Sequence, residues 1–287
     1  MNSKNIFSYH THSTFCDGKA SMEDVCLKAL ELNMSALAFT SHAPVPFDND
    51  FSLNFEQLMD YRCEFDRLNA LYGKQINLLI GVEADYIPGE TVSFNEWRRI
   101  LNLDFVVGSV HLVKNSQNNQ KWFIDGAAEN YVSGLKDIYQ NDIQIAVGDY
   151  YNQVCEMIAT QKPDIVGHID KVKMNNLDRF FQTTDLWYVD LLEKTLNVAK
   201  EFNSILEINS RGIYRSKYHE CFPHTTCIQR CLDLGIPLTL ASDTHHPDEF
   251  EQGFNLSLDI AVNAGVKMVS VFENGKWTQK MIEAFIA

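Results

Sequence analysis

Short apolar segments alternate along the chain with longer segments whose apolar residues recur at helical spacing. Runs of roughly four to eight mainly apolar residues, bounded by polar or turn-forming residues, are typical of buried strands. The predicted strands are residues 7–9, 36–40, 76–82, 105–110, 164–167, 205–209 and 237–241, with a further candidate at 268–271. The pattern therefore predicts a protein built on many short strands.

The segments between the strands have the signals of helix ends and of one apolar helix face. Ser21 and Asp24 form a capping-box-like start, and Gly235 is a suitable residue to end a helix. Helices are predicted after Ser21, at 54–72, around Trp97 and in two segments before Pro163. Further helices are predicted at 185–202, at 225–234, after the strand 237–241 and at the C-terminus. The stretch 114–120 is polar and predicts a loop.

Regular alternation of strand and helix predicts the α/β class with a parallel sheet. No linker, low-complexity tract or block of charge interrupts the alternation, so residues 1–287 are expected to form a single barrel domain. An open, doubly wound sheet is the structural alternative.

Charge and cysteine content reduce the number of protein classes to which this chain could belong. The net charge is −14 and the pI is near 5.0, which disfavours the clustered Lys and Arg of a nucleic-acid partner. The seven cysteines form no C-x-x-C pair, and no apolar run has the roughly 20 residues of a membrane span. We therefore expect a soluble, cytoplasmic protein with no membrane partner.

Metal-type ligands stand at the ends of six of the seven predicted strands. In a parallel barrel these ends share one face, and that face holds the active site. The residues at or just past the strand ends are His10, His12, His42, Glu83, His111, His168, Asp243 and His245, and Asp17 is a ninth candidate in the first loop. The sixth strand differs, because Arg211 and Arg215 follow it.

A mononuclear site takes only three or four protein ligands, so nine candidates indicate two or three metal ions. Glu83 is the candidate to bridge two of them, which would lie about 3.5–4 Å apart. Imidazole and carboxylate ligands without thiolate favour zinc, iron or manganese. Arg211 and Arg215 are candidates for phosphate binding, because a guanidinium can grip phosphate with two hydrogen bonds.

The strand-end motifs also resemble a known family. Y-H-T-H-S, T-S-H, G-V-E, G-S-V-H, G-H-I-D and S-D-T-H, from Tyr9 to His245, are similar to those of the polymerase-and-histidinol-phosphatase (PHP) superfamily. G-V-E-A-D-Y-I-P-G, the Ile124-Asp125 pair and E-I-N-S-R-G further resemble its monofunctional histidinol-phosphatase branch. The resemblance implies a distorted barrel of seven β/α units with three metals, so the candidate strand at 268–271 is expected to be short or outside the barrel.

The resemblance also implies a distribution of the ligands. A first metal would be held by His10, His12, Glu83 and Asp243; a second by Glu83, His111 and His168; and a third by Asp17, His42 and His245. Related phosphatases have a second basic residue after G-H-x-D, where this chain has Lys171 and Lys173, and Lys173 is the candidate for substrate binding. Asp170 is expected to orient a ligand histidine.

The expected reaction is hydrolysis of a phosphate monoester, with Glu83 and Asp243 in the catalytic centre and a metal-bridging hydroxide as the nucleophile. The resemblance names L-histidinol phosphate, a step of histidine biosynthesis, as the substrate. A carboxylate at 48–50 or Glu90 is a candidate partner for the ammonium of this substrate. The alternatives are another PHP phosphoesterase, which would act on a nucleotide-derived phosphate, a phosphodiester or protein phosphotyrosine, a metal-dependent amidohydrolase, and a non-catalytic metal-binding protein.

Overall fold

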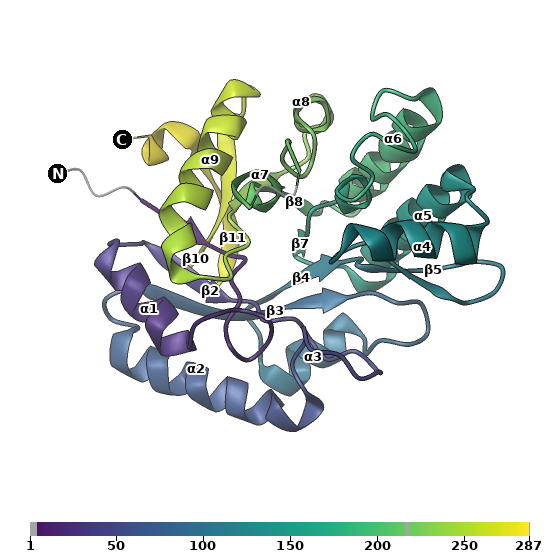
Figure 1. Cartoon of the computed structure of the whole chain (residues 1–287). Helices are drawn as coiled ribbons and strands as arrows, with labels where there is room; N and C mark the ends of the chain where they lie inside the picture. The colour runs from purple at the N-terminus through teal and green to yellow at the C-terminus, as the bar shows by residue number, and fades with distance from the viewer. Residues whose placement is uncertain (1–4, 216–217, 287) are drawn as a thin grey trace.

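Seven parallel strands form one sheet in the order β1-β2-β3-β4-β7-β8-β9 in the computed structural model, which describes residues 5–215 and 218–286 (Figure 1). The strands are β1 (Phe7–Ser8), β2 (Ala36–Phe39), β3 (Asn77–Asp85), β4 (Phe105–Ser109), β7 (Ile165–Val166), β8 (Ile205–Asn209) and β9 (Leu238–Ala241). The segments that follow β1 and β9 meet in a parallel bridge between Thr11 and Thr244. The sheet therefore curls into a nearly closed barrel, which confirms the predicted barrel and excludes the open sheet.

The helices lie around the outside of the strands (Figure 1). They are α1 (Met22–Glu31), α2 (Leu58–Tyr72), α3 (Phe94–Leu101), α4 (Ala128–Tyr139), α5 (Ile143–Gln161), α6 (Leu186–Glu201), α7 (Arg211–Tyr214), α8 (Thr225–Leu234) and α9 (Phe250–Asn263). Ser21 caps α1 by accepting a hydrogen bond from the backbone N–H of Asp24, as predicted. Gly235 follows α8 with a φ of 71°, a conformation that costs glycine little. No helix of the described residues has the length and apolar character needed to cross a membrane.

The barrel strands are buried on both faces, because helices cover the outside and side chains fill the inside. All residues of β2, β4, β8 and β9 are buried, and only the first residue of β3 is exposed. This explains why the strands appear in the sequence as continuous apolar runs. Polar residues at their C-terminal ends are consequently buried as well, and they face the interior of the barrel mouth.

Two hairpins lie outside the seven-stranded sheet. The first joins β5 (Leu112–Lys114) to β6 (Lys121–Phe123) across the predicted polar loop. The second joins β10 (Met268–Glu273) to β11 (Lys276–Met281), so the predicted position of the strand at 268–271 outside the barrel is confirmed.

The predicted C-terminal helix is wrong, because that segment forms β11 and the short 3-10 helix η4 (Ile282–Phe285). Asn274 and Gly275 both have positive φ, 52° and 74°, and form the two-residue turn between β10 and β11. Asn-Gly between two strands is a strong signal for a hairpin, and the prediction of a C-terminal helix did not take it into account. The hairpin packs on the start of β4, where the ring of Trp277 lies 5.4 Å from that of Phe105.

Candidate metal centre

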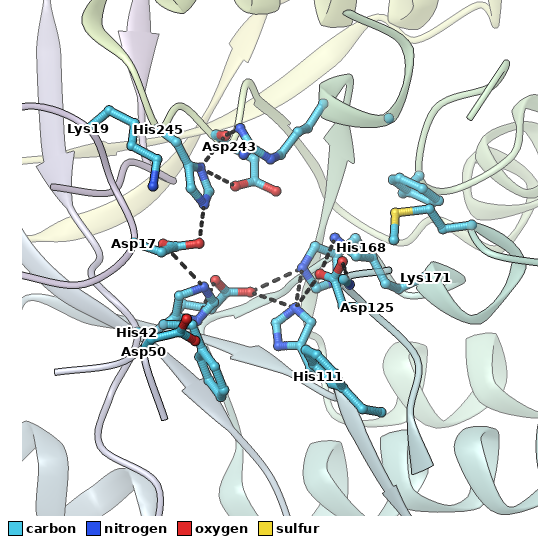
Figure 2. Close-up of a pocket in the computed structure, with 18 residues that line it drawn as sticks. Asp17, Lys19, His42, Asp50, His111, Asp125, His168, Lys171, Asp243 and His245 are labelled. Atoms are coloured by element: carbon cyan, nitrogen blue, oxygen red, sulfur yellow. Dashed lines mark hydrogen bonds and ion pairs between the residues drawn. The ribbon is translucent and has the colours of Figure 1, made fainter. Parts of the chain in front are cut away.

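All nine predicted metal ligands converge on one place at the C-terminal ends of the strands. Glu83 lies within β3, and the other ligands lie in the segments that follow β1, β2, β4, β7 and β9. Eight of the nine are buried, and the side chain of Asp17 is 31% exposed. Figure 2 shows Asp17, Asp243 and His245 on one side of the pocket, and His111 and His168 on another.

Glu83 stands between two sets of histidines. Its Oε2 atom lies 3.1 Å from Nε2 of His10 and 3.4 Å from Nε2 of His12. Its Oε1 atom lies 3.0 Å from Nε2 of His168 and 3.7 Å from Nε2 of His111. Oε2 also lies 3.2 Å from Nδ1 of His42. Each carboxylate oxygen therefore faces a different set of imidazole nitrogens, which is the geometry expected of a bridging ligand.

A third cluster lies next to the first. Asp17, His42, His245 and His12 offer ligand atoms that all lie within 4.8 Å of one another. The Oδ2 atom of Asp17 is 3.2 Å from Nε2 of His245. Asp243 lies between the first and third clusters, with Oδ1 3.4 Å from both His12 Nε2 and His245 Nδ1. The three groups of ligands inferred from the family resemblance are thus close together in space.

Several ligand atoms of this centre have no hydrogen-bond partner among the described residues. These are Nε2 of His10, Nε2 of His12, Nδ1 of His42 and Oδ1 of Asp17, and all are buried. Buried polar atoms are almost always satisfied in folded proteins, and unsatisfied nitrogen and oxygen atoms that point to one place suit a divalent cation. The donor set therefore fits zinc, iron or manganese.

Electrostatic coupling in the centre is strong. Burial would raise the pKa of Glu83, but the charges of His42, His10 and His111 hold that pKa well below its usual range. Burial would lower the pKa of His10, but the carboxylates of Glu207, Glu83 and Asp243 raise it well above its usual value. The carboxylate of Glu83 is therefore ionised at neutral pH, which is the form that binds a cation.

Two carboxylates that support the ligand histidines were not predicted as site residues. Glu207 in β8 accepts a hydrogen bond from Nδ1 of His10 at 2.8 Å and another from the backbone N–H of His168 at 2.8 Å. Asp85 lies 3.0 Å from Nδ1 of His111 and accepts its backbone N–H at 2.9 Å. Such contacts would select the ring nitrogen that is free to bind a metal. Asp85 follows Glu83 by two residues on the same strand face, which is a signal the sequence contained.

The structure places Asp170 and Lys173 in contact with each other, away from the positions that their predicted roles require. Both side chains are fully buried and they pair with each other, with 2.7 Å between Lys173 Nζ and Asp170 Oδ2. Lys173 also donates to the carbonyl of Cys221, and Asp170 accepts the backbone N–H of His224. Oδ1 of Asp170 has no hydrogen-bond partner among the described residues, and no hydrogen bond or ion pair joins Asp170 to a candidate ligand histidine. Lys173 is not among the described residues that line the cavity at this centre.

Seven of the nine candidate ligands line a cavity of about 380 Å³ whose walls also carry three cations, Lys19, Lys171 and Arg211. Lys171 Nζ lies 3.1 Å from Oδ2 of Asp125, and Nη1 of Arg211 donates to the carbonyl of Asp243 at 2.8 Å. The basic residue after G-H-x-D that reaches the pocket is thus Lys171 rather than Lys173. Arg211 lines the cavity as predicted.

Arg215 is not among the described residues that line the cavity. Its side chain is 53% exposed and pairs with Oε1 of Glu249 at 3.3 Å. Its predicted contact with phosphate therefore has no support in this arrangement.

A second wall of the cavity is aromatic and acidic. The rings of Phe51 and Phe123 are nearly parallel, with 6.1 Å between their centres. The exposed carboxylate of Asp50 lies beside them at the pocket wall, and no hydrogen bond or ion pair joins it to another described residue. Of the carboxylates predicted to meet an ammonium, Asp50 lies at the pocket, whereas Glu90 pairs with Lys114 and Lys121.

Metal affinity is expected to rise with pH. Burial would lower the pKa of His111, but Asp85 and Glu83 raise it to about 9. The metal-free protein therefore holds a proton on this ligand at neutral pH, and a metal must displace that proton. We expect the dissociation constant for zinc to fall as the pH increases from about 6 to about 9, measured with a competing chelator. A zinc affinity that is constant over this pH range would contradict the raised pKa of His111.

The comparison with known families agrees with this geometry. The PHP domain family matches residues 8–211, which is more than half of the chain. The chain therefore belongs to the PHP domain family, and the resemblance seen in its strand-end motifs is confirmed.

A curated relative of this chain is named as a probable histidinol-phosphatase, and two solved structures share its fold. The chain is 27% identical to a probable histidinol-phosphatase of Schizosaccharomyces pombe over 93% of this chain and 90% of that protein. The crystal structure of a putative histidinol phosphatase from Listeria monocytogenes is 23% identical, has a TM-score of 0.73, and covers 87% of this chain and 99% of its own. That of histidinol phosphate phosphatase from Lactococcus lactis, complexed with zinc, L-histidinol and phosphate, is 21% identical, has a TM-score of 0.66, and covers 96% and 99%. Both structures share the fold of this chain.

Proposed function

We propose that this protein is a metal-dependent phosphomonoesterase that hydrolyses L-histidinol phosphate to L-histidinol and phosphate. The observation that carries the proposal is Glu83, which presents one oxygen to His10, His12 and His42 and the other to His111 and His168, in a pocket whose walls carry cations. The relatives named as histidinol phosphatases support the choice of substrate.

The three ligand clusters would each hold a divalent metal. His10, His12 and Asp243 would hold the first, His111 and His168 the second, with Glu83 shared by both, and Asp17, His42 and His245 the third. When bound, such metals lower the pKa of water to about 7 and stabilise negative charge on phosphate oxygens. Glu207 and Asp85 keep Nε2 of His10 and His111 directed at the centre, because each contacts the Nδ1 atom of its histidine.

The cations of the pocket wall would bind the phosphate group. Lys171 and Arg211 are both held in place, Lys171 by Asp125 and Arg211 by the carbonyl of Asp243. Cations that are positioned before the substrate arrives need little reorganisation when charge develops on the phosphate oxygens. No hydrogen bond or ion pair joins the ammonium group of Lys19 to another described residue, and Lys19 lies beside Asp17 and His245 at the pocket wall (Figure 2).

The aromatic and acidic wall would bind the leaving group. Phe51 and Phe123 offer a flat apolar surface to an imidazole ring. Asp50 offers an unpaired carboxylate to an ammonium group. The wall with Lys171 and Arg211 thus suits the phosphate group, and the wall with Phe51, Phe123 and Asp50 suits an alcohol that carries an ammonium group and an aromatic ring.

The test is to assay the zinc-loaded and manganese-loaded protein against a panel of phosphate monoesters. The panel includes L-histidinol phosphate, glycerol phosphate, a nucleoside monophosphate, phosphotyrosine and, as a diester, bis-nitrophenyl phosphate. We expect the highest kcat/KM for histidinol phosphate. Equal and slow rates on all the monoesters would contradict the substrate, and preferred hydrolysis of the diester would favour another PHP phosphoesterase.

Replacing Lys171 with Met is expected to weaken phosphate binding. A hydrogen bond between charged groups is worth about 1.5–3 kcal/mol, so kcat/KM is expected to fall by roughly tenfold to a hundredfold. Lys74→Met, which removes an exposed lysine far from the pocket, is the matched control and should leave kcat/KM unchanged. Wild-type kcat/KM and wild-type inhibition by phosphate in the Lys171 variant would contradict the role.

A further inference from the structure

The turn that carries the metal-ligand residues Asp243 and His245 has an unfavourable backbone conformation. Asp243 has a φ of 53°, in the left-handed region that residues with a Cβ atom rarely adopt. Two side chains of α7 hold this turn from one side. The hydroxyl of Tyr214 donates to the carbonyl of Ser242 at 2.7 Å, and Arg211 donates to the carbonyl of Asp243 at 2.8 Å.

Glu249 holds the same turn from the other side. It ends the 3-10 helix η3 (Pro247–Glu249), and its Oε2 atom accepts the backbone N–H of His245 at 2.9 Å and that of His246 at 3.1 Å. The same oxygen lies 3.5 Å from Nη1 of Arg211. Only 9% of Glu249 is exposed, and it is not among the described residues that line the cavity.

We propose that Glu249 is a positioning residue for the third metal cluster. It binds the backbone on both sides of the His245 carbonyl, and this fixes the imidazole with Nε2 3.2 Å from Oδ2 of Asp17. Without an acceptor, the buried N–H of His245 would be unsatisfied, and the strained turn would be free to relax toward an ordinary conformation. Glu249 also contacts Arg211, so one carboxylate holds both the His245 turn and the cation proposed to bind phosphate. The inference rests on the proposed metal binding.

The test measures zinc affinity without substrate. Zinc is titrated into metal-free protein against a chromogenic chelator, and the zinc content is counted by native mass spectrometry. For Glu249→Ala we expect one zinc to bind roughly tenfold to a hundredfold more weakly, while the others bind as in the wild type. Glu249→Gln should restore that affinity, because its amide oxygen can accept both N–H groups. Asp248→Asn is the matched control, since it removes an exposed carboxylate one residue away.

The selective loss of one zinc separates a positioning role from general destabilisation, which would lower the thermal midpoint without a preference among the metals. If the alanine variant does not fold, Glu249→Asp keeps the charge but shortens the reach, and roughly tenfold weaker binding of one zinc is expected. Wild-type zinc affinity in the alanine or aspartate variant would overturn the proposal, and so would a glutamine variant as weak as the alanine variant. A wild-type protein that binds no zinc would instead overturn the proposed function.

Discussion

Replacing Glu83 with Gln is expected to abolish turnover. The carboxylate lies between the first two ligand clusters, with Oε2 3.1 Å from His10 Nε2 and Oε1 3.0 Å from His168 Nε2. An amide is neutral, and its NH2 group would face one cluster as a donor instead of a ligand. We expect kcat to fall by at least about a thousandfold, because both the shared ligand and its charge are lost.

The zinc content of the Glu83→Gln variant should decrease as well. Removing the shared carboxylate leaves the first two clusters with fewer ligands, so metal analysis after gel filtration should find less zinc per chain than in the wild type. Glu64→Gln is the control, since Glu64 pairs with Arg67 on the surface. Normal turnover in a folded Glu83→Gln variant would refute its role as the shared ligand, whatever its metal content.

Removing the metals is expected to abolish activity and to lower the thermal stability. Metal-free protein contains buried histidine and aspartate atoms with no hydrogen-bond partner among the described residues, and it lacks the free energy of metal binding. A ligand at a thousand times its dissociation constant stabilises the native state by about 4 kcal/mol, which corresponds to a shift of roughly 10 °C in the midpoint for a domain of this size. Thermal unfolding before and after chelation measures the shift.

Adding zinc or manganese back to the chelated protein should restore both the activity and the midpoint. Addition of magnesium is the control, because Mg²⁺ prefers oxygen ligands and retains its waters. Phosphate-ester hydrolysis that persists after thorough chelation would contradict the metal-dependent mechanism.

The candidate metal ligands could be predicted from their positions in a parallel barrel. His10, His111 and His168 come just after buried strands, and the C-terminal ends of parallel strands share one face. Their convergence therefore follows from strand order and does not depend on side-chain detail.

The partners of those ligands were not predictable in the same way. A hydrogen bond such as the one between Glu207 and His10 joins residues that are 197 positions apart, and it depends on how the two strands pair in the closed barrel. Lys171 and Lys173 are both basic and only two residues apart. The short 3-10 helix η2 (Lys171–Lys173) directs Lys171 to the pocket and Lys173 to Asp170 in the interior.

The sequence by itself determined the order of the seven barrel strands and of most helices between them, the α/β class, and the nine residues that gather at the C-terminal ends of the strands, because periodicity and strand position are local properties. Only the tertiary structure decided which carboxylates support the histidines, which cations reach the pocket, and that Glu249 joins the His245 turn to Arg211. Those outcomes depend on distances of about 3 Å between residues far apart in the chain, and only the closed barrel sets such distances.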